Sequence, residues 1–231
     1  MTMIENQIST VRQRMAAACQ AAGRAPDSVR LLAVSKTFDA QAVLAAHAAG
    51  QRAFGENYIQ EAVEKITRLR HLPLQWHCIG PIQSNKTRLV AEHFDWVQTV
   101  DRLKIAERLS EQRPPHLAPL QVCIQVNVDG GVSKSGVAPP AALALAQAVM
   151  ALPGLRLRGL MCIPEPAADF ASACAVFKKA KDLFDALNTA GLALDTLSMG
   201  MSADLEAAIA SGSTLVRVGS AIFGQRDGHH A

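Results

Sequence analysis

A lysine that directly follows a short apolar run is the first residue of this sequence that could do chemistry. Residues 31–34 are apolar, and Ser35, Lys36 and Thr37 come next. Such a run is typical of a strand buried on both faces, and ligands bind where strands of this kind end. Burial there lowers the pKa of a lysine and leaves a nucleophilic amine for Schiff-base chemistry. Alternatively, the stem of Lys36 covers apolar surface while its ammonium stays in water.

Two loops near the C-terminus could hold a phosphate group. Residues 198–204 read SMGMSAD and residues 217–224 read RVGSAIFG. Small residues let backbone N–H groups approach an anion, and the start of a helix adds a partial positive charge. Because glycine–serine turns are common, each loop alone is a weak signal. Both loops follow expected strands at positions where α/β barrels often bind phosphate, which favours a phosphorylated ligand beside Lys36.

Two polar residues near these segments have two interpretations each. Arg217 lies in an apolar strand shortly before Gly219, and a buried guanidinium needs a partner. That partner could be a carboxylate such as Glu56 in an internal salt bridge, or the ring of a ligand whose phosphate lies next door. Asn57 follows the second expected strand. It could cap the next helix or contact the same ligand.

The elements that position these residues follow from the apolar periodicity. We expect a helix at 5–24 and then eight strands, at 31–34, 52–55, 76–80, 96–100, 120–128, 155–163, 194–198 and 214–218. A helical segment should follow each strand, including 40–49, one ending at 68, one ending at 92, 102–112 capped by Asp101, 141–152, 170–191 and a short one at 220–224. Eight such units predict a single (β/α)8 barrel domain, a TIM barrel, over residues 1–231, with an open doubly wound sheet as the alternative.

Composition argues against several classes of protein. The 231 residues are 49% hydrophobic and 19% charged, as in an ordinary globular protein. The net charge of +3, with scattered signs, indicates neither nucleic acid nor a membrane surface as a partner. No apolar stretch has the length of a membrane span, and the first residues lack a signal-peptide pattern. The histidines and the five cysteines lack the spacings of a metal site, so we expect no metal and reduced thiols in the cytoplasm.

Several motifs together resemble a known family. They are AVSKT at 33–37, FGENY at 54–58, HCIGPIQSNK at 77–86, SKSG at 133–136, LMCIP at 160–164 and the two loops at 198–204 and 217–224. The motifs extend over nearly the whole chain and resemble the small pyridoxal-phosphate-binding homeostasis proteins. Such proteins are similar to the N-terminal barrel of alanine racemase, and they bind pyridoxal 5′-phosphate (PLP) as a lysine Schiff base.

The resemblance implies a role for each candidate residue. Lys36 would form the Schiff base with PLP, Arg217 would face the pyridine nitrogen, and Asn57 would lie beside the ring. The phosphate would be held by Ser202, Gly219, Ser220 and the backbone near Met201. Two glycines at 130–131 replace a more acidic turn before Lys134, so no role is carried over to Lys134.

An arginine at the pyridine nitrogen favours a carrier over an enzyme. PLP acts as an electron sink, which works best when a carboxylate protonates the ring nitrogen. Arginine keeps its own proton and would leave that nitrogen unprotonated. Two-base racemisation also needs a base on each face of the reacting carbon, and racemases bring one from an added β domain. This chain ends 7 residues after Gly224, and its only tyrosine, Tyr58, belongs to an expected helix.

We therefore expect a monomeric cytoplasmic protein that holds PLP, helps to balance vitamin B6 and amino-acid metabolism, and has no established catalysis. PLP-dependent enzymes that accept the cofactor would be its protein partners. Two other functions remain open: a PLP-dependent amino-acid racemase with low activity, and a Schiff-base aldolase acting on a phosphosugar. A chiral amino-acid assay distinguishes a racemase from a carrier. The visible absorbance of the protein distinguishes a PLP-binding protein from a phosphosugar aldolase.

Overall fold

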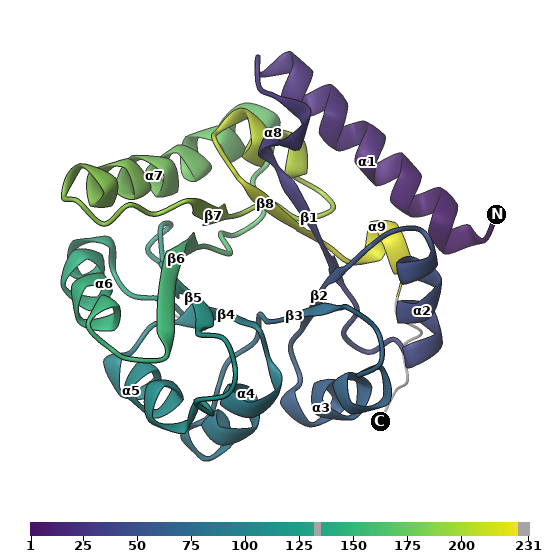
Figure 1. Cartoon of the computed structure of the whole chain (residues 1–231). Coiled ribbons are helices and arrows are strands. Elements are labelled where there is room, and N and C mark those ends of the chain that lie inside the picture. The colour runs from purple at the N-terminus through teal and green to yellow at the C-terminus, as the bar shows by residue number, and fades with distance from the viewer. Residues whose placement is uncertain (132–134, 226–231) are drawn as a thin grey trace.

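Eight parallel strands close into a barrel that is surrounded by helices (Figure 1). The computed structural model describes residues 1–131 and 135–225. Each strand pairs with the next, and the last strand, β8 (Leu215–Val218), pairs in parallel with the first, β1 (Arg30–Val34). This last pairing closes the barrel. The expected (β/α)8 architecture is therefore confirmed, and an open doubly wound sheet is excluded.

The elements agree with the expected ones to within a few residues at most ends. The other strands are β2 Ala53–Glu56, β3 Gln75–Cys78, β4 Trp96–Val100, β5 Leu120–Gln125, β6 Leu155–Met161 and β7 Thr196–Ser198. The helices are α1 Met3–Ala21, α2 Ala40–Ala48, α3 Ile59–Arg68, α4 Thr87–His93, α5 Leu103–Gln112, α6 Ala142–Met150, α7 Phe170–Thr189, α8 Leu205–Ala210 and α9 Ser220–Phe223. Short 3₁₀ turns lie at η1 Pro26–Ser28, η2 Ser84–Lys86 and η3 Pro139–Ala141.

Two local expectations are wrong. Strand β5 ends earlier than expected, at Gln125; the N–H of Val126 still donates to Met161 of β6 at 2.9 Å, but Val126 pairs with Val137 of the following loop in an isolated bridge. Asp101 does not cap α5, whose N-cap is Arg102 without a side-chain hydrogen bond. The Asp101 carboxylate instead accepts a hydrogen bond of 3.1 Å from the backbone N–H of Gly136.

The additional N-terminal helix packs on the barrel where β8 meets β1. A capping box between Thr2 and Glu5 starts α1, and its apolar face, including Ile8, Val11 and Met15, is buried. This helix contacts α2, α8 and α9, and Figure 1 shows it (purple) along the outside of that part of the ring. The helix therefore supports the loops that follow β7 and β8.

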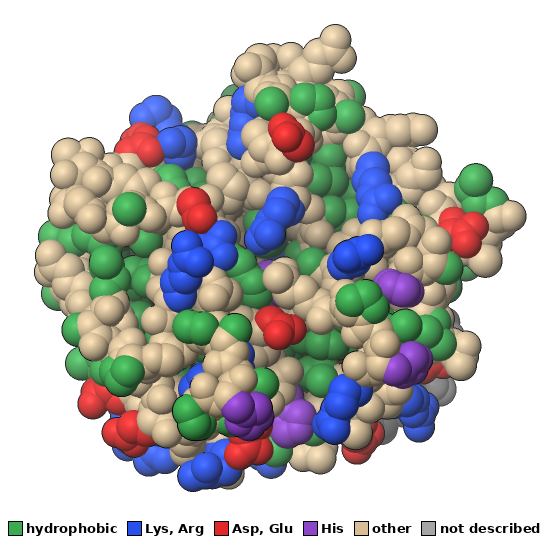
Figure 2. Space-filling model, viewed as in Figure 1, with side chains coloured by type: hydrophobic (Ala, Val, Ile, Leu, Met, Phe, Trp, Pro, Cys, Tyr) green, Lys and Arg blue, Asp and Glu red, His purple; other side chains and the backbone are tan. Residues whose placement is uncertain are grey.

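The surface is mixed in character. On the face shown in Figure 2, basic side chains are interspersed with acidic and apolar ones. Within the described residues, no helix combines the length and the apolar character that crossing a membrane requires.

Candidate functional site

A pocket of about 510 Å³ opens where several strands lead into the following loops. Its lining includes all seven residues singled out from the sequence: Lys36, Asn57, Met201, Ser202, Arg217, Gly219 and Ser220. The rest of the described lining is mainly apolar or small and consists of Val34, Phe38, Ile79, Ile163, Ala203, Gly224 and Gln225. These residues come from both ends of the sequence, and closure of the barrel brings them together.

Lys36 lies half-buried in the turn between β1 and α2. The backbone N–H of the preceding residue, Ser35, donates to the carbonyl of Gly55 at 3.0 Å, so contact with β2 continues up to the lysine. Two residues after the lysine, Phe38 stacks on Phe223 of α9 with 5.2 Å between the ring centroids. The loop that carries Lys36 is thus anchored to the neighbouring strand and to the helix after β8.

The register between β1 and β8 places the last loop beside this lysine. Ala33 is opposite Val218, and a Cβ atom added to Gly219 would lie 3.4 Å from Val34. Gly219 is the N-cap of α9, and Ser220 is its first residue. The first N–H groups of a helix have no partner within the helix. The N–H groups of Gly219 and Ser220 can therefore face an anion in the pocket next to Lys36, whereas that of Ala221 donates to Ser202.

Hydrogen bonds within the loop between β7 and α8, and from this loop to other elements, hold it in place. The backbone N–H of Met201 donates to Asp204 Oδ1 at 2.7 Å. The Ser202 hydroxyl accepts a bond of 3.3 Å from the N–H of Ala221, which joins this loop to the one after β8. The Ser202 carbonyl accepts a bond of 2.8 Å from Arg14 on α1. Sequence reasoning missed Arg14, because its partner lies 188 residues away and no local pattern connects them.

Arg217 is 4% exposed and is held by two neutral groups. Its Nη1 donates to Ser198 Oγ at 2.7 Å, and its Nη2 donates to the carbonyl of Cys162 at 2.9 Å. Burial lowers the pKa of Arg217, but a guanidinium is basic enough to stay protonated. The suggested salt bridge to Glu56 is wrong, because Glu56 pairs with Lys65 at 3.0 Å.

A chain of buried polar side chains continues from Arg217 through the barrel interior. Ser198 Oγ donates to Gln98 Oε1 at 2.6 Å, and Gln98 Nε2 donates to His77 Nδ1 at 2.9 Å. His77 Nε2 then donates to Gln75 Oε1 at 2.9 Å. Burial lowers the pKa of His77 well below its usual value, so the ring is neutral and Nδ1 can accept. This series of hydrogen bonds fixes the position of the Ser198 hydroxyl, which accepts from the guanidinium of Arg217.

Asn57 lines the pocket with an unsatisfied acceptor. Its Oδ1 is buried and has no hydrogen-bond partner among the described residues. The alternative role as a helix cap is wrong, since the N-cap of α3 is Tyr58 and no side chain caps this helix. Gly80 lies close against Asn57, because a Cβ atom added to Gly80 would be 2.4 Å from the Asn57 carbonyl oxygen. Buried acceptors are normally satisfied, so Oδ1 marks a place for a ligand donor or water.

The described lining of the pocket offers few groups for chemistry. It contains the amine of Lys36, the guanidinium of Arg217 and the hydroxyls of Ser202 and Ser220, with no Asp, Glu, His, Cys or Tyr. Two cationic side chains and helix-start N–H groups suit a phosphorylated ligand, and a half-buried amine suits a carbonyl carbon. Lys134 lies outside the described residues.

No metal site emerges from the part of the chain that the structure describes. Over residues 1–131 and 135–225, no three His, Cys, Asp or Glu side chains gather as metal ligands would. All five cysteines are free thiols. Burial raises the pKa of three of them, Cys78, Cys123 and Cys162, to about 12. These three thiols therefore stay protonated at neutral pH and are poor nucleophiles and poor metal ligands.

Known proteins resemble this chain over nearly its whole length. Residues 7–227 match the family model of the alanine racemase N-terminal domain. The pyridoxal phosphate homeostasis protein of Pseudomonas aeruginosa is 62% identical over 227 residues, which cover 98% of this chain and 97% of that protein. The protein of the same name from Escherichia coli K12 is 52% identical over 230 residues, and these cover 98% of both chains.

Solved structures agree with the sequence relatives. PipY of Synechococcus elongatus, solved without and with PLP bound, is 38% identical, and the match covers 96% of this chain and all of that one. The TM-scores are 0.85 for the structure without PLP and 0.83 for the structure with PLP. Full-length matches at these identities confirm the resemblance drawn from the motifs. The chain belongs to the pyridoxal phosphate homeostasis protein family, whose barrel is that of the alanine racemase N-terminal domain.

Proposed function

We propose that this protein binds PLP through a Schiff base on Lys36 and serves in the balance of vitamin B6 and amino-acid metabolism. The observation that carries the proposal is the gathering of Lys36, Arg217 and two phosphate-type loops around one pocket. The names of the relatives and the PLP bound to PipY support it. In this linkage the amine nitrogen of Lys36 bonds to the aldehyde carbon, and the aldehyde oxygen leaves as water.

The groups around the pocket suit the parts of PLP. The phosphate would lie against the N–H groups at the start of α9 and against the loop after β7, where the proposed contacts are Ser202, Gly219, Ser220 and the backbone of Met201. Arg217 would donate to the pyridine nitrogen. The unsatisfied Oδ1 of Asn57 would lie beside the ring, and a polar ligand or a water that it retains can satisfy this oxygen.

The same residues favour a carrier over a racemase. Bound PLP supplies an electron sink, and Arg217 has only donors to offer a ring nitrogen, so it leaves that nitrogen unprotonated and the sink weak. A racemase also needs two bases. In the described lining, Lys36 is the one side chain other than arginine that carries a basic group. The relatives are likewise named for homeostasis.

We also propose a cellular location, an oligomeric state and partners for this protein. Free cysteines, in the part of the chain that the structure describes, suit a reducing cytoplasm. We propose a monomer, and the presence of all seven proposed PLP contacts within this one chain supports it. Acceptor enzymes that use PLP are the proposed partners. Sedimentation of the purified protein at micromolar concentration should give the mass of one chain, and a stable dimer would reopen the possibility of a second base from a neighbour.

A covalent map tests the proposal directly. The purified protein loaded with PLP should absorb visible light, and borohydride should fix a pyridoxyl group on Lys36, where mass spectrometry of a digest will find it. An adduct on Lys86 or Lys134 alone would refute the assignment, and a colourless protein that instead traps a phosphosugar would support an aldolase. Racemisation of alanine or serine faster than with free PLP would contradict the carrier role.

A further inference from the structure

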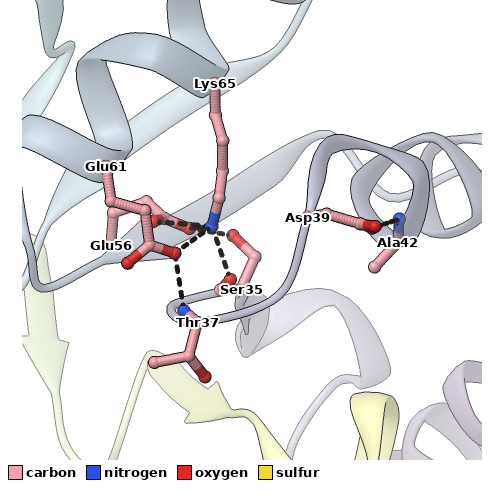
Figure 3. A network of polar contacts seen from close by, with 7 residues as sticks. All are labelled: Ser35, Thr37, Asp39, Ala42, Glu56, Glu61 and Lys65. Carbon is pink, nitrogen blue, oxygen red and sulfur yellow. Dashed lines mark hydrogen bonds and ion pairs between the residues drawn. The ribbon is translucent and has the colours of Figure 1, made fainter.

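A network of charged side chains contacts the residues on either side of Lys36 without belonging to the described lining of the ligand pocket. Lys65 on α3 points from its helix toward the turn that carries Lys36, and Glu56 and Glu61 converge on it (Figure 3). The Lys65 side chain is 7% exposed and that of Glu56 is fully buried. Lys36 belongs to the described pocket lining, whereas Lys65 does not. The network therefore needs a role other than direct contact with the ligand.

All three N–H donors of the Lys65 ammonium are used. They reach the carbonyl of Ser35 at 2.8 Å and the two carboxylate oxygens of Glu56 at 3.0 and 3.1 Å, and the ammonium also forms an ion pair with Glu61 Oε1 at 2.8 Å. Since an ammonium has only three N–H donors, each donor of Lys65 has an acceptor. Ser35 is also bound a second time, because its hydroxyl donates to Glu56 Oε2. The residue before Lys36 is thus held through both its backbone and its side chain.

The residue after Lys36 is held by the same network. Glu61 Oε1, which forms an ion pair with Lys65, accepts a hydrogen bond of 2.7 Å from the backbone N–H of Thr37. Thr37 has a φ of +69°, a left-handed conformation that is unfavourable for a β-branched residue and persists only where the surroundings enforce it. Further along, Asp39 accepts from the N–H of Ala42 at 3.0 Å and caps α2. Lys36 is therefore the central residue of a turn that is fixed on both sides.

We propose that Glu56, Lys65 and Glu61 are positioning residues, which hold the turn at residues 35–37 so that the Lys36 amine is presented to the pocket. The inference rests on the proposed Schiff base at Lys36. A buried ammonium and carboxylate are costly to desolvate. Here both bind Ser35 before the reactive lysine, and Glu61, which pairs with the ammonium, binds Thr37 after it. Without them, Thr37 can relax from its strained conformation and Lys36 must be ordered when the bond to the ligand forms.

Two ligands separate positioning of Lys36 from general support of the pocket. PLP carries an aldehyde and can bond to Lys36, whereas pyridoxine 5′-phosphate has the same ring and phosphate but no aldehyde. Glu61→Ala removes the acceptor for Thr37 at a half-exposed position and should leave the fold intact. Its Kd for PLP should rise about fivefold to tenfold, while its Kd for pyridoxine 5′-phosphate changes less than about twofold. Lys65→Met should show the same split with a larger ratio.

Two further variants complete the test. Glu61→Gln keeps an oxygen that can accept from Thr37 and should restore most of the PLP affinity. Glu64→Ala removes a carboxylate from an exposed position of the same helix and should leave both affinities unchanged. If Glu61→Ala and Lys65→Met weaken both ligands equally, or weaken neither, the positioning role is refuted. If instead the proposed Schiff base on Lys36 is wrong, the wild-type protein itself will lack a borohydride adduct on Lys36, which distinguishes this outcome from refutation of the positioning role.

Discussion

Replacing Arg217 by methionine should separate the stability of the protein from its affinity for PLP. Methionine has a similar length but carries no charge. The change removes two hydrogen bonds to a charged group, from Nη1 to Ser198 and from Nη2 to Cys162, together worth about 3–6 kcal/mol. It also removes a guanidinium that is buried and held by neutral groups, and the desolvation of such a charge costs several kcal/mol.

These two contributions are of similar size and opposite sign. The free energy of unfolding without ligand should therefore change by less than about 2 kcal/mol, or about 4–8 °C in Tm for a chain of this length. PLP, by contrast, should lose one hydrogen bond from a charged donor. That loss costs about 1.5–3 kcal/mol, which raises the Kd roughly tenfold to a hundredfold. Denaturant unfolding of the ligand-free protein and a PLP titration followed by absorbance measure the two quantities.

Arg113 provides the matched control. It donates to the carbonyls of Ala91 and Phe94 at 2.8 and 2.7 Å and to Ala118 at 2.9 Å, and it is not part of the described pocket lining. Arg113→Met should therefore lower the free energy of unfolding by about 1–3 kcal/mol and leave the Kd for PLP unchanged. If Arg217→Met behaves as Arg113→Met does, with stability lost and affinity intact, then Arg217 is a structural residue and our assignment of it to the ligand is wrong.

Two more predictions concern buried positions. His77 has a pKa well below 6.5 in the folded protein, so it takes up a proton only on unfolding. Stability should therefore be lost as the pH falls below 6.5, by about 1.4 kcal/mol per pH unit from this residue, and a pH series of unfolding curves should show that slope in the wild type but not in His77→Gln. Gly80→Ala would place a Cβ atom 2.4 Å from the Asn57 carbonyl and should cost about 1–3 kcal/mol of stability as well as PLP affinity. Gly219→Ala meets only a contact of 3.4 Å and should unfold like the wild type, and equal losses from both glycine variants would contradict the steric argument.

The barrel and the surroundings of its pocket could be predicted from the sequence because both depend on local patterns. Apolar runs of strand length, separated by helical periodicity, specify eight alternating units, and an eight-unit series closes. Once β8 pairs with β1, the loops after the first, seventh and eighth strands must share one rim. The placement of Lys36, Arg217 and Gly219 in one pocket therefore follows from their positions directly after, or within, those strands.

The partners of the buried polar groups depended on the tertiary structure. From the sequence, Glu56 could pair with Arg217, and Asn57 could cap a helix. In the folded chain, Glu56 pairs with Lys65 from the next helix, and Arg217 binds the neutral groups of Ser198 and Cys162. Which charges meet inside a barrel is set by strand register and helix rotation, and sequence spacing alone does not specify either.

The sequence by itself determined the type of barrel, the family and the side chains that surround the pocket, because these follow from periodicity and from continuous motifs. Only the tertiary structure showed that the turn of Lys36 is held by Lys65 and Glu61. An amphipathic helix pattern gives no reason to expect a lysine that is 7% exposed. Lys65 is buried because α3 packs its ammonium against the carbonyl of Ser35 and two carboxylates, and this compensation exists only when all three elements are in place.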